Sequence, residues 1–248
     1  MQEKQNGKPT PILIAIVVIV CATTIAAEFW DQIHIPSTFP RLSDNFPEPL
    51  SAWDSYLFLM INVGLANPVI SQFLSIMTVL GSLSASVTVC GAFFLFGDEK
   101  RALNASCSLI LISLLTLLLK TIVMRPRPYM VIPATFIVSA ESGWSFPSGH
   151  SGRVFSLLPS TRKAGKTLTL FGYSMASLIA FSRIYLGVHY LLDVVFGAVI
   201  GYIAGLITRN SNGLLSSLFE NRMARFSAVF YVKAQANTRL RRLEKYHD

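Results

Sequence analysis

Charged residues are scarce in this chain. They make up 14% of its 248 residues, and the 13 acidic side chains are outnumbered by 21 lysines and arginines. A soluble domain usually carries about a quarter charged residues. The shortage of charge, the 52% hydrophobic content and the long uncharged runs exclude an ordinary soluble protein and predict an integral membrane protein. The length suits one membrane domain rather than two globular domains.

Other absences narrow the function. The three cysteines have no metal-ligand spacing, so neither a zinc site nor a structural disulfide is predicted. No carboxylate cluster is suited to a metal pair, so we expect no metal and no cofactor. No nucleic-acid motif, internal repeat or low-complexity segment is visible, and the formal net charge of +8 gathers in short loops and the C-terminal tail. That distribution is typical of cytoplasmic loops and contact with anionic headgroups, so we expect no nucleic-acid partner.

The predicted fold is all-α: a polytopic membrane protein with six transmembrane helices in a bundle, interfacial helices and a basic C-terminal tail. The predicted membrane domain covers residues 1–208 and the tail residues 209–248. The predicted spans are residues 11–27, 82–97, 102–124, 148–160, 168–186 and 190–208. The first span also fits a cleaved signal peptide, because small residues lie near its end, but its length favours an uncleaved helix.

The segments between the spans are mixed in character. Residues 28–53 carry four prolines and predict an exposed loop with short helical pieces. Residues 54–80 are apolar but interrupted, which predicts interfacial or partly embedded helices. The tail interleaves basic and apolar residues, which suits a helix lying on an anionic leaflet or a short soluble helix packed on the loops.

The distribution of basic residues predicts the topology. Six spans put both termini on one side, and that side then collects most of the lysines and arginines outside the motifs described below. The positive-inside rule makes it the cytoplasmic side. We therefore expect a multi-pass protein of the plasma membrane with cytoplasmic termini and its polar motifs on the extracytoplasmic face.

Three polar clusters stand at the edges of apolar runs. They are Lys120-(six residues)-Arg127-Pro128, Pro147-Ser148-Gly149-His150, and Ser182-Arg183-(five residues)-His189-(three residues)-Asp193. Ionisable groups in or beside membrane spans are costly and are functional candidates by default.

Three cations on one face predict a site for a multiply charged anion. Arg127 and Arg183 can bind phosphate oxygens in bidentate fashion, and Lys120 acts as a point charge. Lys120 alone is also compatible with snorkelling to the interface. Arg125 either extends the anion site or is a loop charge.

The second cluster begins a helix. Ser148 is compatible with a simple helix cap, but the same geometry leaves backbone N–H groups free to hold an anion, and Gly149 permits close approach. His150 in the first turn then faces the same pocket.

His189 and Asp193 are four residues apart, so on a helix they share a face. A carboxylate there fixes the imidazole tautomer and leaves the other nitrogen able to attack. A hydrogen-bonded pair that seals a helix end is the simpler interpretation, but two histidines, one carboxylate and three cations exceed what sealing requires.

Together the clusters resemble the signature of the type 2 phosphatidic acid phosphatase family, over residues 54–208, with every signature position filled. The resemblance implies that His189 attacks phosphorus to form a phosphohistidine, that Asp193 orients His189, and that His150 protonates the leaving oxygen and then activates water. It implies that the phosphoryl oxygens are held by Lys120, Arg127, Ser148, Gly149 and Arg183.

The expected function is that of a metal-independent membrane lipid phosphatase, with a polyprenyl diphosphate as the first choice of substrate. Phosphatidic acid, phosphatidylglycerophosphate and a lipid A phosphate remain alternatives, as do a lipid phosphotransferase and a non-catalytic lipid-binding or transport protein. Vanadate-dependent haloperoxidases share similar motifs but are soluble. The sequence leaves the oligomeric state open.

Overall fold

The computed structural model describes residues 43–96, 99–133, 143–161 and 165–211, and within these ranges all regular structure is helical. The helices are α2 (Leu50–Asn62), α3 (Pro68–Val79), α4 (Leu83–Leu95), α5 (Glu99–Val123), α6 (Pro128–Val131), α7 (Gly149–Thr161), α8 (Lys166–Tyr185) and α9 (Leu191–Asn210). The all-α prediction is confirmed for these residues. The first predicted span lies outside them, and so does the basic tail beyond residue 211.

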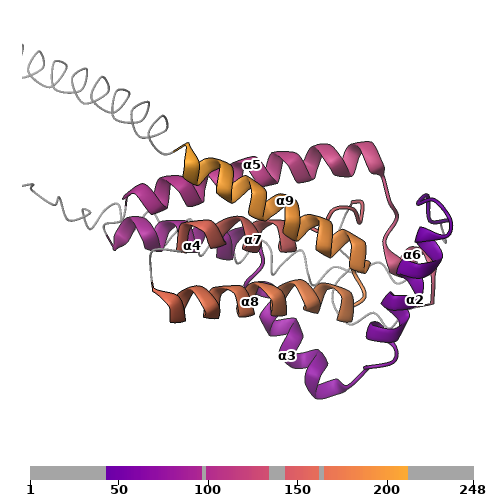
Figure 1. Cartoon of the computed structure of the whole chain (residues 1–248). Helices are drawn as coiled ribbons and strands as arrows, with labels where there is room; N and C mark the ends of the chain where they lie inside the picture. Colours follow the sequence, from indigo (N-terminus) through magenta and orange to yellow (C-terminus); the bar gives the residue numbers. More distant parts are fainter. Residues whose placement is uncertain (1–42, 97–98, 134–142, 162–164, 212–248) are drawn as a thin grey trace, which may run out of the picture. The chain divides into compact units, whose positions relative to one another are not determined.

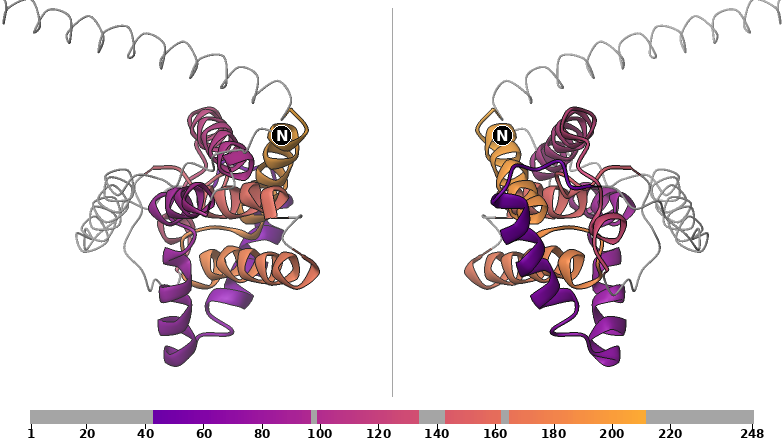
Figure 2. Two further views of the ribbon diagram at one scale, coloured as in Figure 1. Left: turned by 90° about the vertical axis from the view of Figure 1, so that its left-hand side faces the viewer. Right: turned by 90° about the vertical axis from the view of Figure 1, so that its right-hand side faces the viewer.

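Helix α7 occupies the centre of the bundle. It packs against α4, α5 and α8, and the end-on views show it between α5 and α9 on one side and α8 on the other (Figures 1 and 2). Its apolar residues Val154 and Leu158 are buried with Ala176 and Ile179 of α8. The helix that begins with the second motif is therefore enclosed by neighbours.

Helices α7 and α9 approach so closely that glycine is required between them. A Cβ atom on Gly201 would lie 2.1 Å from the carbonyl oxygen of Gly152, and one on Gly197 would lie 2.5 Å from that of Ser148. Small residues at four-residue spacing permit such backbone contact between membrane helices. The contact places the second motif beside the first turn of α9, where the third motif ends.

The connection from α2 to α3 is fastened to the end of α8. Asn62 donates from Nδ2 to the carbonyl of Tyr185 at 2.8 Å, and the Tyr185 hydroxyl accepts from the Asn67 amide at 2.8 Å. Asn67 also caps α3 by accepting from the amides of Val69 and Ile70, as asparagine does at helix starts. Helices α2 and α3 are thus held against the segment that carries the third motif.

Helix α5 ends in a sharp turn. Met124 has a φ of +51°, a left-handed conformation that is uncommon for a bulky residue. Asn45 stabilises the turn by donating from Nδ2 to the carbonyl of Val123 at 2.8 Å. The turn redirects the chain so that Arg125 and Arg127 enter the protein interior.

Two predicted segments differ from the structure. Helix α2 begins at Leu50, four residues before the predicted boundary at residue 54. Asp54 therefore lies inside the helix, on its buried face. Residues 128–131 form a short helix between the predicted third and fourth spans, since Pro128 is well suited to a first helical turn.

Two helical stretches of the described residues are long and apolar enough to cross a membrane, Lys100–Val131 and Leu191–Asn210. Helices α3 and α4 together would make a third, bent by 53°. The prediction of six spans stays a prediction, as does the division into a membrane domain and a tail.

Candidate active site

The three motifs meet in the structure although they are far apart in sequence. Arg127 donates from Nη1 to the carbonyl of Val188 at 3.1 Å, which joins the first motif to the third. The Ser148 amide donates to the carbonyl of Asp193 at 2.9 Å, which joins the second to the third. The end of α5, the start of α7 and the turn between α8 and α9 therefore build one site.

His189 lies at the centre of this site and is 1% exposed. Its Nδ1 is 3.4 Å from Asp193 Oδ2, and its Nε2 is 3.5 Å from Arg127 Nη1. Because a guanidinium only donates hydrogen bonds, Nε2 presents its lone pair to Arg127 and Nδ1 carries the proton toward the carboxylate. The sequence predicted this contact between imidazole and carboxylate on a helix face, but His189 lies in the turn that precedes α9.

The surroundings keep His189 neutral. Burial lowers the pKa of His189, the hydrogen bond to Asp193 opposes this, and the positive charges of Arg127 and Lys120 lower it further, so that the net pKa is about 3. The imidazole thus retains a lone pair at neutral pH, which a nucleophile needs. Its backbone is also fixed, because the amides of Val188 and His189 both donate to the carbonyl of Arg183 at 3.2 Å.

Asp193 is fully buried and held through both carboxylate oxygens. Oδ2 accepts from the Tyr190 amide at 2.9 Å and from the Ser145 hydroxyl. Oδ1 accepts from Arg125 Nη1 at 3.0 Å. Ser145 was not identified from the sequence, since a lone serine in a loop has no spacing signal.

Arg125 is neither an extension of the anion site nor a loop charge. It is fully buried and contacts three carboxylates, those of Asp44, Asp54 and Asp193. Four of its five N–H groups are directed at these carboxylates. Asp44 and Asp54 were not identified from the sequence. Their only signal there was that they are acidic residues beside an apolar segment.

The predicted phosphate-binding residues of the first and third motifs have different partners. Arg127 is 2% exposed and donates from Nε to the carbonyl of Gly143 at 2.9 Å. The Lys120 ammonium donates to the carbonyl of Trp144. Arg183 is buried and donates from Nη1 to the hydroxyl of Thr78 on α3, so the structure sets its side chain against α3.

The start of α7 carries the second motif. The Ser148 hydroxyl lies 3.5 Å from the Ser151 amide, as expected of a helix cap, and Gly149 is the first helical residue. His150 is partly buried, with Nδ1 3.3 Å from Arg153 Nη2. Since the guanidinium can only donate, neutral His150 carries its proton on Nε2.

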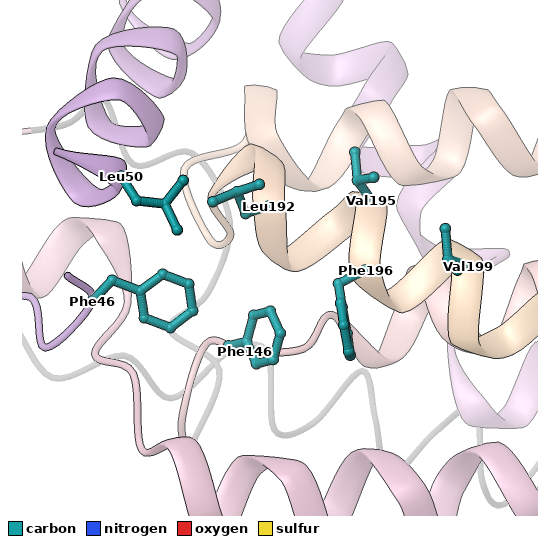
Figure 3. A pocket seen from close by; sticks show the side chains of 7 residues that line it. All are labelled: Phe46, Leu50, Phe146, Leu192, Val195, Phe196 and Val199. Atoms are coloured by element: carbon teal, nitrogen blue, oxygen red, sulfur yellow. The ribbon is translucent and has the colours of Figure 1, made fainter. Parts of the chain in front are cut away.

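An apolar groove of about 310 Å³ lies beside the site. Phe146 separates Phe46 from Phe196 in the groove wall, with ring centroids 5.3 Å and 4.8 Å apart (Figure 3). The other lining residues are Leu50, Leu192, Val195 and Val199. Phe146 directly precedes the second motif and Leu192 directly precedes Asp193, so the groove adjoins the polar site along the chain.

The chain is similar to known membrane phosphatases. Residues 101–214 match the family model of the PAP2 superfamily. Undecaprenyl-diphosphatase BcrC of Bacillus subtilis (strain 168) is 30% identical over 131 residues, which cover 50% of this chain and 66% of that protein. An undecaprenyl-diphosphatase of Sulfolobus acidocaldarius is 33% identical over 88 residues, which cover 33% of this chain and 41% of that protein. The matches thus span at most about two thirds of these relatives.

Two solved structures share the fold. LpxE of Aquifex aeolicus superposes with a TM-score of 0.58 at 28% identity, over 66% of this chain and 96% of that chain. A PAP2 type phosphatidylglycerolphosphate phosphatase of Bacillus subtilis superposes with a TM-score of 0.56 at 21% identity, over 80% and 95%. The second likeness concerns the fold alone.

Proposed function

The chain carries a PAP2 superfamily domain, and from this premise we propose that it is an integral membrane phosphatase that removes the terminal phosphate of a lipid through a phosphohistidine on His189. The observation that carries the proposal is the environment of this imidazole, which is buried between Asp193 on Nδ1 and Arg127 on Nε2. A neutral imidazole with one oriented nitrogen and one nitrogen beside a cation is suited to attack an anionic phosphoryl group.

In the proposed reaction, His189 Nε2 forms a bond to phosphorus while the bond from phosphorus to the leaving oxygen breaks. His150, acting as the imidazolium, gives a proton to that oxygen and becomes neutral. Water then attacks the phosphohistidine, His150 takes a proton from the water, and phosphate leaves with His189 restored. Lys120, Arg127 and Arg183, with the Ser148 hydroxyl and the Gly149 amide, neutralise the phosphoryl oxygens, which is the main requirement of phosphoryl transfer.

A polyprenyl diphosphate is the proposed substrate, which becomes the monophosphate. Two relatives bear the name undecaprenyl-diphosphatase, and the apolar groove beside Phe146 offers a surface for the hydrocarbon chain. Phosphatidic acid, phosphatidylglycerophosphate and a lipid A phosphate are the alternatives among substrates. We place the site on the extracytoplasmic face of the plasma membrane, because the positive-inside rule puts the basic loops in the cytoplasm.

The test is phosphate release by the purified full chain in detergent with excess chelator. Polyprenyl diphosphate, phosphatidic acid and phosphatidylglycerophosphate are offered in parallel. We expect release of phosphate from polyprenyl diphosphate and a trapped, acid-labile phosphohistidine. Both should be lost in His189→Ala. His34→Ala is the matched control, because this histidine lies outside the motifs, and it should retain full activity.

Other outcomes would redirect the assignment. Preference for another lipid would change the substrate and leave the chemistry intact. A trapped phosphohistidine that passes its phosphoryl group to a second lipid instead of water would make the protein a phosphotransferase. Lipid binding with neither release nor trapping, in folded protein, would refute an enzymatic role.

A further inference from the structure

The most unusual group outside the predicted site is the Arg125 cluster, which consists of Arg125, Asp44 and Asp54. The Arg125 guanidinium is fully buried and enclosed on both faces, with its carbon 4.0 Å from the ring centre of Phe46 and 3.8 Å from that of Tyr190. Nε and Nη2 donate to the two carboxylate oxygens of Asp44 at 3.2 and 2.8 Å. A guanidinium covered in this way has its edges and faces occupied by the protein, so it is not available to bind a substrate phosphate.

The Nη1 group of Arg125 contacts Asp193 in the predicted site. Arg125 Nη1 donates to Asp193 Oδ1 at 3.0 Å and to Asp54 Oδ2 at 2.7 Å. Asp193 therefore has its Oδ1 held by Arg125, while its Oδ2 faces Nδ1 of His189. A carboxylate fixed at both oxygens cannot rotate about its terminal bond, so its direction toward the imidazole is set.

Asp54 connects the same arginine to the backbone that carries Asp193. Its Oδ1 accepts from the amide of Leu192 at 3.1 Å. This amide belongs to the first turn of α9, where helix N–H groups lack partners within the helix. One carboxylate from α2 thus holds both the guanidinium that contacts Asp193 and the turn from which Asp193 projects.

The charges of the cluster also suit this role. Asp193 has to remain ionised so that it stabilises the positive charge that His189 acquires on attack. A buried charge-assisted hydrogen bond from Arg125 favours the ionised carboxylate. Asp44 and Asp54 in turn keep the guanidinium in place, so the arginine is held toward Asp193 whether or not substrate is bound.

We propose that Arg125 and Asp54 are positioning residues that act through Asp193 to fix the tautomer and orientation of His189. The proposal rests on the assignment of His189 as the nucleophile. It assigns the arginine two residues before Arg127 a role distinct from phosphate binding, and it gives the interfacial helix α2 a part in the chemistry.

The kinetic test compares Arg125→Lys and Asp54→Asn with Arg101→Lys, a conservative control in the first turn of α5. Lysine keeps the charge but has no planar fork, and asparagine keeps the shape of Asp54. We expect kcat for the preferred lipid to fall roughly 10- to 100-fold in both variants, as for other groups that orient a functional ligand. KM should change less than about threefold, since the phosphate contacts remain, and the control should match the wild type.

A second readout reports the tautomer directly. Nitrogen NMR of protein labelled with ¹⁵N-histidine, assigned by comparison with His189→Gln, should show the Nδ1–H form of His189 in the wild type and a mixture in Arg125→Lys and Asp54→Asn. A folded variant that keeps both kcat and the wild-type tautomer would overturn the proposal, and so would a loss confined to KM. If Arg125→Lys does not fold, Asp54→Asn decides.

The two readouts separate this proposal from the proposed function. Absence of phosphate release by the wild-type protein would refute the phosphatase assignment alone, because the tautomer of His189 can still be compared among the variants. A wild-type enzyme that hydrolyses lipid, with variants of unchanged tautomer, would refute the positioning role alone.

Discussion

Two arginines separated by a single proline, Arg125 and Arg127, are both almost completely buried and yet serve opposite sides of one imidazole. Arg125 is surrounded by carboxylates and reaches His189 through Asp193. Arg127 donates to the carbonyls of Gly143 and Val188 and lies 3.5 Å from Nε2 of His189.

The difference lies in what each set of partners does to the charge. Carboxylates compensate the charge of Arg125, so this side chain contributes geometry. Arg127 donates to two backbone carbonyls, and its positive charge lowers the pKa of His189. An arginine in a membrane protein therefore has to be interpreted from its partners, because its identity and burial are the same in both roles.

The strongest test of this comparison removes the ring on which both arginines act. His189→Gln should reduce kcat at least about 10⁴-fold, as loss of a nucleophile or its base does in other covalent mechanisms. Because residues that act as a unit are not additive, Arg127→Lys or Arg125→Lys should cause little further loss in this background. Phosphate release by the single and double variants provides the measurement, and a double variant much weaker than His189→Gln would contradict a shared target.

Replacing Arg127 should have the next largest effect. We expect Arg127→Lys to lower kcat/KM roughly 10²- to 10³-fold, because a bidentate contact to developing phosphoryl charge is lost. The loss should appear partly in KM and in weaker inhibition by vanadate, whereas Arg125→Lys should leave vanadate inhibition unchanged. Equal effects of the two variants on vanadate inhibition would show that the two arginines do not differ in role.

The titration of His189 sharpens the comparison further. A pKa of about 3, below the ordinary value of about 6.5, means that the folded protein keeps the ring neutral as pH falls through 6.5. The unfolded chain takes up that proton first, so acidification between these values favours unfolding. We expect the ¹⁵N shifts of His189 to stay constant from pH 8 to pH 5.

Removing the charge of Arg127 gives the matched comparison for this titration. Arg127→Gln should raise the pKa of His189, since a positive neighbour disfavours the imidazolium. The same NMR titration on this variant supplies the measurement. A wild-type transition near pH 6.5 would contradict the buried, neutral ring.

Asp44→Asn should have the smallest effect on catalysis. Asp44 contacts Arg125 but not Asp193, and Arg125 keeps Nη1 on Asp54 and Asp193 without it. We expect a loss of about 1–3 kcal/mol in the free energy of unfolding, typical of a hydrogen bond to a charged group, with kcat reduced less than about threefold. Thermal unfolding and phosphate release measured on one preparation separate the two effects. A kcat loss as large as that of Asp54→Asn would show that Asp44 is also a positioning residue.

Much of the site was predictable because it is encoded by spacing. The structure confirms the contact between His189 and Asp193, although His189 lies in the turn before α9 and not on the helix itself. It also confirms a helix that starts within one residue of the predicted boundary at residue 148. The convergence of the three motifs is confirmed by the contacts of Arg127 with Val188 and of Ser148 with Asp193. The number of spans was harder to predict from the sequence. Helices α3 and α4 are bent against each other at Ser82 and its neighbours, and composition does not encode such a bend.

The partners of Arg125 could not be predicted. Asp44, Asp54 and Asp193 come from a loop, from α2 and from α9, at separations of 81, 71 and 68 residues from the arginine. No local period relates residues at such distances, and Ser145 lies in a segment without regular structure.

The sequence by itself determined that the chain is apolar, that the described residues are helical, that its motifs resemble those of membrane phosphatases, and which histidines and cations stand near the helix ends. These features depend on composition and on short intervals of three to seven residues along the chain. Only the tertiary structure decided which arginine faces His189 with its charge and which one orients Asp193. That distinction arises from the close contact of α7 with α9 and from the turn at Met124, because burial of a charge is tolerated only where distant partners meet it.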